Sequence, residues 1–144
     1  MKLFQQSLID LNGSIYPETI KEDLIQGFSF QHLLMLYNRL DSLFYLAKDQ
    51  QKIIGFIFGW FEHGIFWVDW VGVIPQYRSK GVGTLLFDTL TNFCREQKCH
   101  KIVFNTITKN SRAIDLYQRI GFKVEALFKN HWYKEDWSYL SKEL

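Results

Sequence analysis

The spacing of apolar side chains along the chain predicts an alternation of strands and helices. Aromatic and β-branched residues dominate residues 65–73, as in a buried strand, and Pro75 ends it because proline has no N–H to donate. Apolar positions then recur at three- and four-residue spacing, which places them on one helix face, over residues 82–97 and again over residues 111–120. This order favours an α/β fold with a mixed sheet.

The remaining segments extend this order to the whole chain. We expect strands at 43–48, 53–61, 101–107, 122–128 and 136–143, turns at 49–51 and 63–64, and helices around 5–12 and 18–40 with breaks near Pro17 and Gly27. Segments 65–73 and 102–107 should be parallel neighbours, because a crossover containing a helix joins them. We interpret residues 1–144 as a single domain, long enough to bury about two thirds of its unfolded surface.

A basic loop with two glycines precedes the helix at 82–97. It reads Tyr77-Arg78-Ser79-Lys80-Gly81-Val82-Gly83-Thr84. The start of a helix carries unpaired N–H groups and the positive end of the macrodipole, and glycines let a phosphate approach the backbone closely. The loop therefore predicts a pyrophosphate site. It is neither a Walker loop, which needs Gly-Lys followed by Ser or Thr, nor a dinucleotide fingerprint, whose third glycine would replace Leu86.

A second motif opens the helix at 111–120. Asn110 is a good N-cap and Gly121 a good helix stop. Asn110 and Tyr117 are seven residues apart, so they lie on nearly the same side of the helix, about 10 Å apart along its axis. Taken alone, Tyr117 would be interpreted as a core residue of an amphipathic helix.

Together the two motifs resemble the GCN5-related N-acetyltransferase (GNAT) superfamily. The matching residues are Val71, Val73, Pro75, Tyr77 to Gly83, Asn110, Ala113, Tyr117, Gly121 and Phe122. The resemblance is firm from about Phe44 to Phe122 and poor over residues 1–42. It implies a single-domain α/β fold whose mixed, mostly antiparallel sheet is flanked by helices and contains a parallel strand pair that splays apart. It also implies transfer of an acetyl group from acetyl-CoA to an amine.

The resemblance implies a role for each residue of the two motifs. Backbone groups of Val71 and Val73 would bond the pantetheine amides, an N–H near Val71 would stabilise the oxyanion, and Tyr117 would protonate the departing thiolate. The full acetyl-CoA set is Val71, Gly72, Val73, Arg78, Ser79, Lys80, Gly81, Val82, Gly83, Thr84, Asn110, Ala113 and Tyr117. A covalent acyl-enzyme is not expected, because no Ser or Cys occupies a nucleophile elbow.

Asp69 is the candidate general base. Period-two alternation would place it on the same strand face as Val71 and Val73, and burial among tryptophans would raise its pKa. The alternative is a buried aspartate satisfied by backbone donors. Some protein-acetylating relatives carry a Glu or His base at the position of Asn105. An asparagine cannot act as a base, so this chain departs from them there. Reserve candidates are Glu62, His63 and His131.

Aromatic residues near the end of the chain are candidates for binding the amine acceptor. Residues 129–139 are rich in aromatics and resemble the hairpin of ribosomal-protein and N-terminal amine acetyltransferases. Candidate acceptor-binding residues are Trp67, Asn105, His131 and Trp132. A homodimer contact through surface aromatics is the alternative interpretation of this segment. The acceptor is a peptide or protein amine, or a small-molecule amine; the sequence does not choose between them.

Charge, hydropathy and cysteine spacing argue against several classes of function and partner. The net charge of +2 is too small to favour nucleic acid as a partner. We expect a cytoplasmic protein with no membrane partner, because no apolar run approaches 18 residues and no signal-peptide pattern is present. The spacing of Cys94, Cys99 and His100 does not fit a zinc site, so we expect no metal. The alternative to an enzyme is a non-catalytic acyl-CoA-binding sensor or interaction domain.

Overall fold

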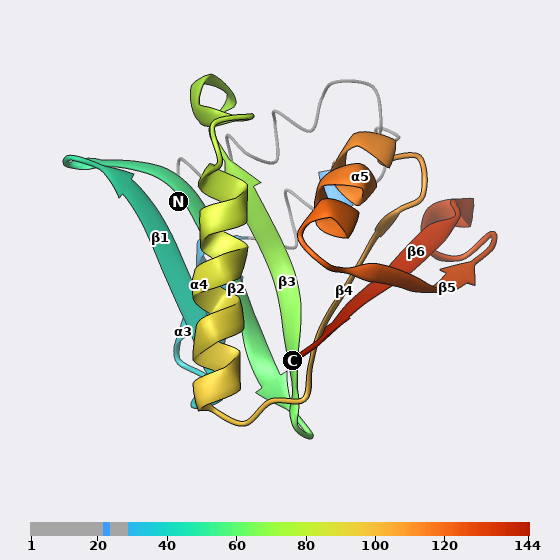
Figure 1. Cartoon of the computed structure of the whole chain (residues 1–144), viewed down its shortest axis with the longest axis horizontal. Helices are drawn as coiled ribbons and strands as arrows, with labels where there is room; N and C mark the ends of the chain where they lie inside the picture. Colours follow the sequence, from blue (N-terminus) through green and yellow to red (C-terminus); the bar gives the residue numbers. More distant parts are fainter. Residues whose placement is uncertain (1–21, 24–28) are drawn as a thin grey trace.

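A six-stranded mixed sheet forms the centre of the protein (Figure 1). The structure is a computed structural model that describes residues 22–23 and 29–144. The predicted helix at 5–12, the breaks near Pro17 and Gly27 and most of residues 18–28 lie outside the described residues. In chain order the elements are α3 (Phe30–Tyr37), β1 (Ser42–Asp49), β2 (Lys52–Glu62), β3 (Ile65–Val73), η1 (Pro75–Tyr77), α4 (Val82–Glu96), β4 (Lys101–Ile107), α5 (Ser111–Arg119), β5 (Lys123–Phe128), η2 (Trp132–Lys134) and β6 (Trp137–Glu143).

The strands follow the order β1-β2-β3-β4-β6-β5. Every neighbouring pair is antiparallel except β3 and β4, which are parallel. The predicted mixed, mostly antiparallel sheet is therefore confirmed. The observed strands begin and end within one residue of the predicted bounds. The same is true of the helices predicted at 82–97 and 111–120.

The main core lies between the sheet and one face of α4 (Figure 1). Leu86, Phe87, Leu90 and Cys94 follow helical spacing and are all buried. A smaller apolar cluster forms on the other face of the sheet, where Leu36 of α3 packs with aromatic residues of β2. In the described part of the chain, α3 therefore covers this face of the sheet over β1 and β2. None of the helices in the described part of the chain combines the length and apolarity that crossing a membrane requires.

The parallel pair β3–β4 separates after three residue pairs. Ile65, Phe66 and Trp67 pair with Lys101, Ile102 and Val103, while β3 continues to Val73 and β4 to Ile107 without pairing with each other. Figure 1 shows the two strands diverging, with α4 and α5 on either side of the opening. This confirms the predicted splayed pair.

A bulge interrupts β3 just beyond the last parallel pair. Gly59 of β2 is opposite Val68 and Phe58 is opposite Trp70, so Asp69 is an extra residue without a partner. Phe66 and Val68 before the bulge, and Val71 and Val73 after it, all pack on the same core. The bulge breaks the alternation of side chains between Val68 and Val71. The prediction that Asp69 shares a strand face with Val71 and Val73 assumed unbroken alternation, so it has no basis in this strand.

Candidate active site

The loop between β3 and α4 leaves the start of the helix open. Gly81 is the N-cap residue with φ +83°, a left-handed conformation that glycine adopts without strain. No side chain caps the helix, and the first helical bond runs from the Leu85 N–H to the Gly81 carbonyl (2.9 Å). A Cβ added at Gly81 would meet nothing within 4 Å, and one at Gly83 would meet only Leu116 Cδ2 at 3.9 Å. The first turn therefore has no side-chain cap and little side-chain volume around its two glycines, which is the arrangement that anion binding at a helix start requires.

Side chains on both flanks hold this loop in place. The Arg78 Nε donates to the Val73 carbonyl (2.9 Å), and the Tyr77 hydroxyl donates to Asp49 Oδ2 (2.6 Å). From α5, the Arg112 Nη2 donates to Ser79 Oγ (3.0 Å). Arg78 was predicted only as a phosphate ligand, but here it also fixes the end of β3. Sequence reasoning missed Arg112, because nothing in its local pattern indicates a partner 33 residues away.

Asn110 starts α5 without the side-chain cap that the sequence predicted. Its carbonyl accepts from the N–H groups of Ala113 (3.1 Å) and Ile114 (3.0 Å), but its amide Nδ2 is directed to Thr106 Oγ1 (3.4 Å). Asn110 is therefore the N-cap residue, as predicted, but its side chain makes no capping bond because its amide is directed to β4. Gly121 follows the last turn with φ +98°, which confirms the predicted helix stop.

The Tyr117 ring is fixed at the junction of α4, β4 and α5. It makes edge-to-face contacts with Phe104 of β4 (centroids 4.6 Å apart) and Phe87 of α4 (5.5 Å), and lies 6.4 Å from Phe122. The ring is half-buried against the main core. The phenylalanine neighbours hold the ring at a fixed place beside the splayed strands. Packing of the ring is therefore compatible with a chemical role for the hydroxyl.

Asp69 is half-buried and lies at the bulge of β3. Among the described residues, no side-chain hydrogen bond or ion pair reaches its carboxylate, and burial raises its pKa from 3.8 to about 6. A carboxylate with this pKa is largely ionised at neutral pH yet basic enough to take a proton. That behaviour fits a general base better than a carboxylate neutralised by an ion pair.

An aromatic row crosses the sheet on the face opposite α4. Trp67 stacks on Trp60 of β2 (centroids 6.4 Å apart) and contacts Tyr139 of β6 (6.0 Å), while Asn105 of β4 is directly opposite Tyr139. The structure thus brings together the predicted Trp67 and Asn105, and it adds Tyr139, which the sequence analysis did not single out. This row begins where β3 and β4 separate.

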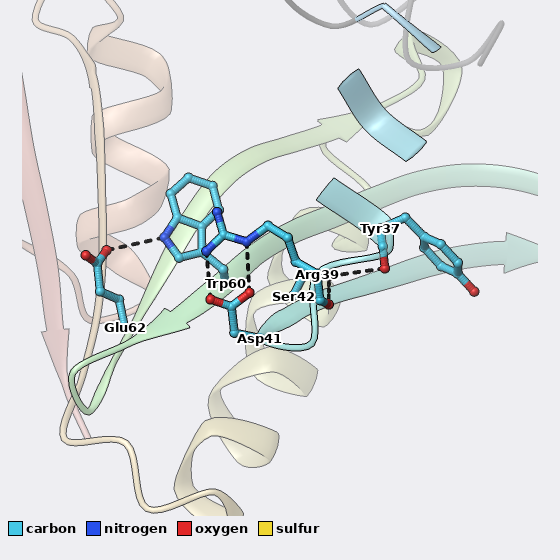
Figure 2. Close-up of polar contacts among 6 residues, drawn as sticks. All are labelled: Tyr37, Arg39, Asp41, Ser42, Trp60 and Glu62. Atoms are coloured by element: carbon cyan, nitrogen blue, oxygen red, sulfur yellow. Dashed lines mark hydrogen bonds and ion pairs between the residues drawn. The ribbon is translucent and has the colours of Figure 1, made fainter. Parts of the chain in front are cut away.

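Figure 2 shows how the outer end of the row is held. The Arg39 guanidinium lies 5.1 Å from the centre of the Trp60 ring and donates two hydrogen bonds to Asp41 (2.8 and 2.7 Å). The Trp60 indole N–H donates to Glu62 (3.3 Å). Glu62 is therefore engaged at the end of β2, away from Asp69, and is a poorer candidate for the base.

His131 and Trp132 belong to a separate aromatic cluster in the β5–β6 connection. His131 stacks on Phe128 (5.2 Å) and contacts Trp132 (4.6 Å), which packs edge-on against Trp137 (5.2 Å). Within the described chain no ring contact joins this cluster to Trp67. The structure therefore does not bring the predicted acceptor-binding residues into one group.

The two cysteines lie in the core at the far end of α4. Both are buried free thiols, and burial raises the pKa of Cys94 to about 12. Among the residues that the structure describes, no group of three His, Cys, Asp or Glu side chains could hold a metal ion.

Comparison with known proteins places this site in a family. The model of the acetyltransferase (GNAT) family matches residues 6–122. N-alpha-acetyltransferase 30 of Dictyostelium discoideum is 27% identical over 115 residues, which cover 76% of this chain and 62% of that protein. The matched region thus spans less than two thirds of that relative's length.

Solved structures share the fold at low sequence identity. PaiA N-acetyltransferase from Thermoplasma acidophilum, in complex with coenzyme A, superposes with a TM-score of 0.86 at 21% identity, covering 99% of this chain and 89% of that one. The ribosomal-protein-S18-alanine N-acetyltransferase from Escherichia coli gives 0.76 at 16% identity, covering 98% and 86%. Because the family match extends over most of the sequence and the same fold recurs in these enzymes, the chain belongs to the acetyltransferase (GNAT) family.

Proposed function

We propose that this protein is an N-acetyltransferase that moves an acetyl group from acetyl-CoA directly to a primary amine. One observation carries the proposal: the open first turn of α4 follows, after η1 and the basic loop, a strand whose end is unpaired with its parallel neighbour. A pyrophosphate and an amide-containing arm would be held by these two features in succession. Acetyl-CoA supplies the acetyl group as an activated thioester.

The residues of this chain divide the binding between backbone and side chains. N–H groups of Val82, Gly83 and Thr84 would hold the pyrophosphate, with Ser79 and Lys80 beside them. Beyond Trp67, the backbone of residues 71–73 has no partner on β4, so it can bond the pantetheine amides as an added strand would. Arg78 supports both parts, because it joins the loop to the end of β3.

Two side chains would move protons. An acceptor amine is mostly protonated near neutral pH, so its proton must be removed before the nitrogen can attack. Asp69 would accept this proton, directly or through a water molecule. Tyr117 would donate a proton to the departing sulfur, whose ordinary pKa of about 8.5 is close to the tyrosine value of about 10.

The acceptor would reach the gap over the aromatic row of Trp67 and Tyr139, beside Asn105. His131 and Trp132 would contribute only to a longer acceptor, since they form their own cluster. A peptide amine and a small-molecule amine both fit this surface. Use of acetyl-CoA and two unpaired buried thiols favour a reducing, cytoplasmic location.

A thiol-release assay over a panel of amines and N-terminal peptides tests the proposal. We expect free CoA to appear only when an acceptor is present. The competing function, an acyl-CoA sensor, predicts tight acetyl-CoA binding in calorimetry with no turnover on any member of the panel. Rapid CoA release without an acceptor would contradict both functions.

Gly83→Val should weaken acetyl-CoA binding at least about tenfold without loss of folding. The valine side chain would occupy the space above the first turn, whereas inside the protein its Cβ meets only Leu116 at 3.9 Å. Valine is also a better helix former than glycine, by roughly a few tenths of a kcal/mol, so the helix itself should not be weakened. Calorimetry measures the affinity, and Thr89→Val in the same helix is the matched control. Unchanged affinity in a folded Gly83→Val variant would contradict the pyrophosphate assignment.

A further inference from the structure

Gly59 lies opposite the bulge, at a point where β2 has no room for a side chain. A Cβ built on Gly59 would overlap the Trp67 carbonyl oxygen and lie 2.9 Å from both the Trp67 carbonyl carbon and the Phe66 ring. Side chains in a regular ladder stand clear of the partner's backbone. The backbone of β3 therefore occupies the volume that a residue 59 side chain would fill.

Neither neighbour can move aside easily. Phe66 is completely buried and packs edge-on against Phe61 (centroids 4.9 Å apart). Trp67 is paired on both sides, with Trp60 of β2 and with Val103 of β4. The overlap would therefore have to be relieved by the β3 backbone itself.

The position of this contact is important for the site. Trp67 is the last β3 residue that pairs with β4, and the extra residue Asp69 follows two positions later. The close approach at Gly59 thus coincides with the place where β3 leaves β4. Strand bulges bend a strand and redirect the side chains beside them.

We propose that Gly59 is a positioning residue: by carrying no side chain it lets β3 form the bulge that opens the β3–β4 gap and orients Asp69. This inference rests on the proposed acetyltransferase function. Gly59 itself touches no substrate and acts through the backbone of Trp67 and Val68. Any larger residue would force β3 away from β2 or move the bulge.

Gly59→Ala should lower kcat by about 10², the size of loss expected when reacting groups are displaced by about 1 Å. Affinity for acetyl-CoA should fall less than kcat, because the loop that holds the pyrophosphate lies beyond the end of β3, although residues 71–73 next to the bulge also contribute to binding. Leu90→Ala, a core change on α4, is the control that loses stability without touching β2 or β3 backbone. We expect it to keep its kcat at a temperature where circular dichroism shows it folded.

Deleting Asp69 provides a readout that needs no activity. Without this residue, Phe66, Val68, Val71 and Val73 still alternate onto the core, and the ladder becomes regular. In this background Gly59→Ala should leave the melting temperature nearly unchanged, whereas in the wild-type chain it should lower it by several degrees. If the single variant does not fold, recovery of folding in the double variant supports the same conclusion.

Two results would overturn the positioning role. One is that Gly59→Ala lowers the melting temperature equally with and without Asp69, which would show that the substitution disturbs ordinary core packing and not the bulge. The other is a folded Gly59→Ala variant with wild-type kcat. A wild-type protein that binds acetyl-CoA but acetylates no amine would instead refute the proposed function and this inference with it.

Discussion

Tyr117→Phe is expected to lower kcat by about 10²–10⁴, the range for loss of a general acid. The substitution removes only the hydroxyl, and the ring contacts with Phe104 and Phe87 remain possible. Acetyl-CoA affinity and melting temperature should therefore change little. Steady-state kinetics with the best acceptor from the panel, together with calorimetry, measure both quantities.

Tyr45→Phe is the matched control for this prediction. Tyr45 is another half-buried tyrosine that packs edge-on against an aromatic ring of α4, Phe93 (6.0 Å), but it lies on β1 away from the gap. Its variant should keep wild-type kcat. Wild-type turnover in Tyr117→Phe would show that Tyr117 serves packing alone.

Asp69→Asn should lose turnover by roughly 10² or more at pH 7, in the range for a lost general base. The wild-type rate should fall as pH drops below the Asp69 pKa of about 6, because only the ionised carboxylate accepts a proton. The variant should lack this dependence and recover part of its rate at high pH, where amines lose their protons unaided. A pH–rate profile of both proteins measures the difference.

The same variant should be more stable than wild type at neutral pH. The folded protein raises the Asp69 pKa from 3.8 to about 6, so the protonated form is favoured on folding. The stability of the wild-type protein therefore decreases as pH rises from about 4 to 6, and above that the ionised carboxylate costs on the order of 3 kcal/mol. Asparagine avoids this cost. Thermal melts of both proteins from pH 4 to 8 should show that the difference between their melting temperatures increases with pH and becomes constant above about pH 6.

A uniform loss of rate at every pH, with a lower melting temperature than wild type, would identify Asp69 as a structural residue. Full activity would move the search for the base to His131 or to a bound water molecule. His131 stacks on Phe128 and contacts Trp132, outside β3, so its own substitution is a second and independent test.

The sequence was sufficient for the features that depend on local periodicity. The strand at 65–73 and the helix at 82–97 were predicted within one residue, because burial on one face imposes period two or 3.6 on the apolar residues. The splayed pair followed from the family resemblance. The open first turn of α4 followed from Gly81 and Gly83, whose types already imply close backbone approach.

Features that depend on pairing between distant residues were not predicted. The bulge at Asp69 exists only in the register between β2 and β3, and the sequence signal that could have indicated it is Gly59 within an apolar strand. The Asn110 side chain bonds Thr106 instead of capping α5, and Arg112 reaches Ser79 across the loop. Such partners are set by tertiary structure, so spacing along the chain does not reveal them.

Isotope-labelled acetyl-CoA tests the central claim of direct transfer to an amine. With the best acceptor from the panel, we expect the label on the acceptor nitrogen, free CoA in equal amount, and an unmodified protein by intact-mass spectrometry throughout turnover. Label covalently attached to the protein, or CoA release with no acetylated acceptor, would contradict the account.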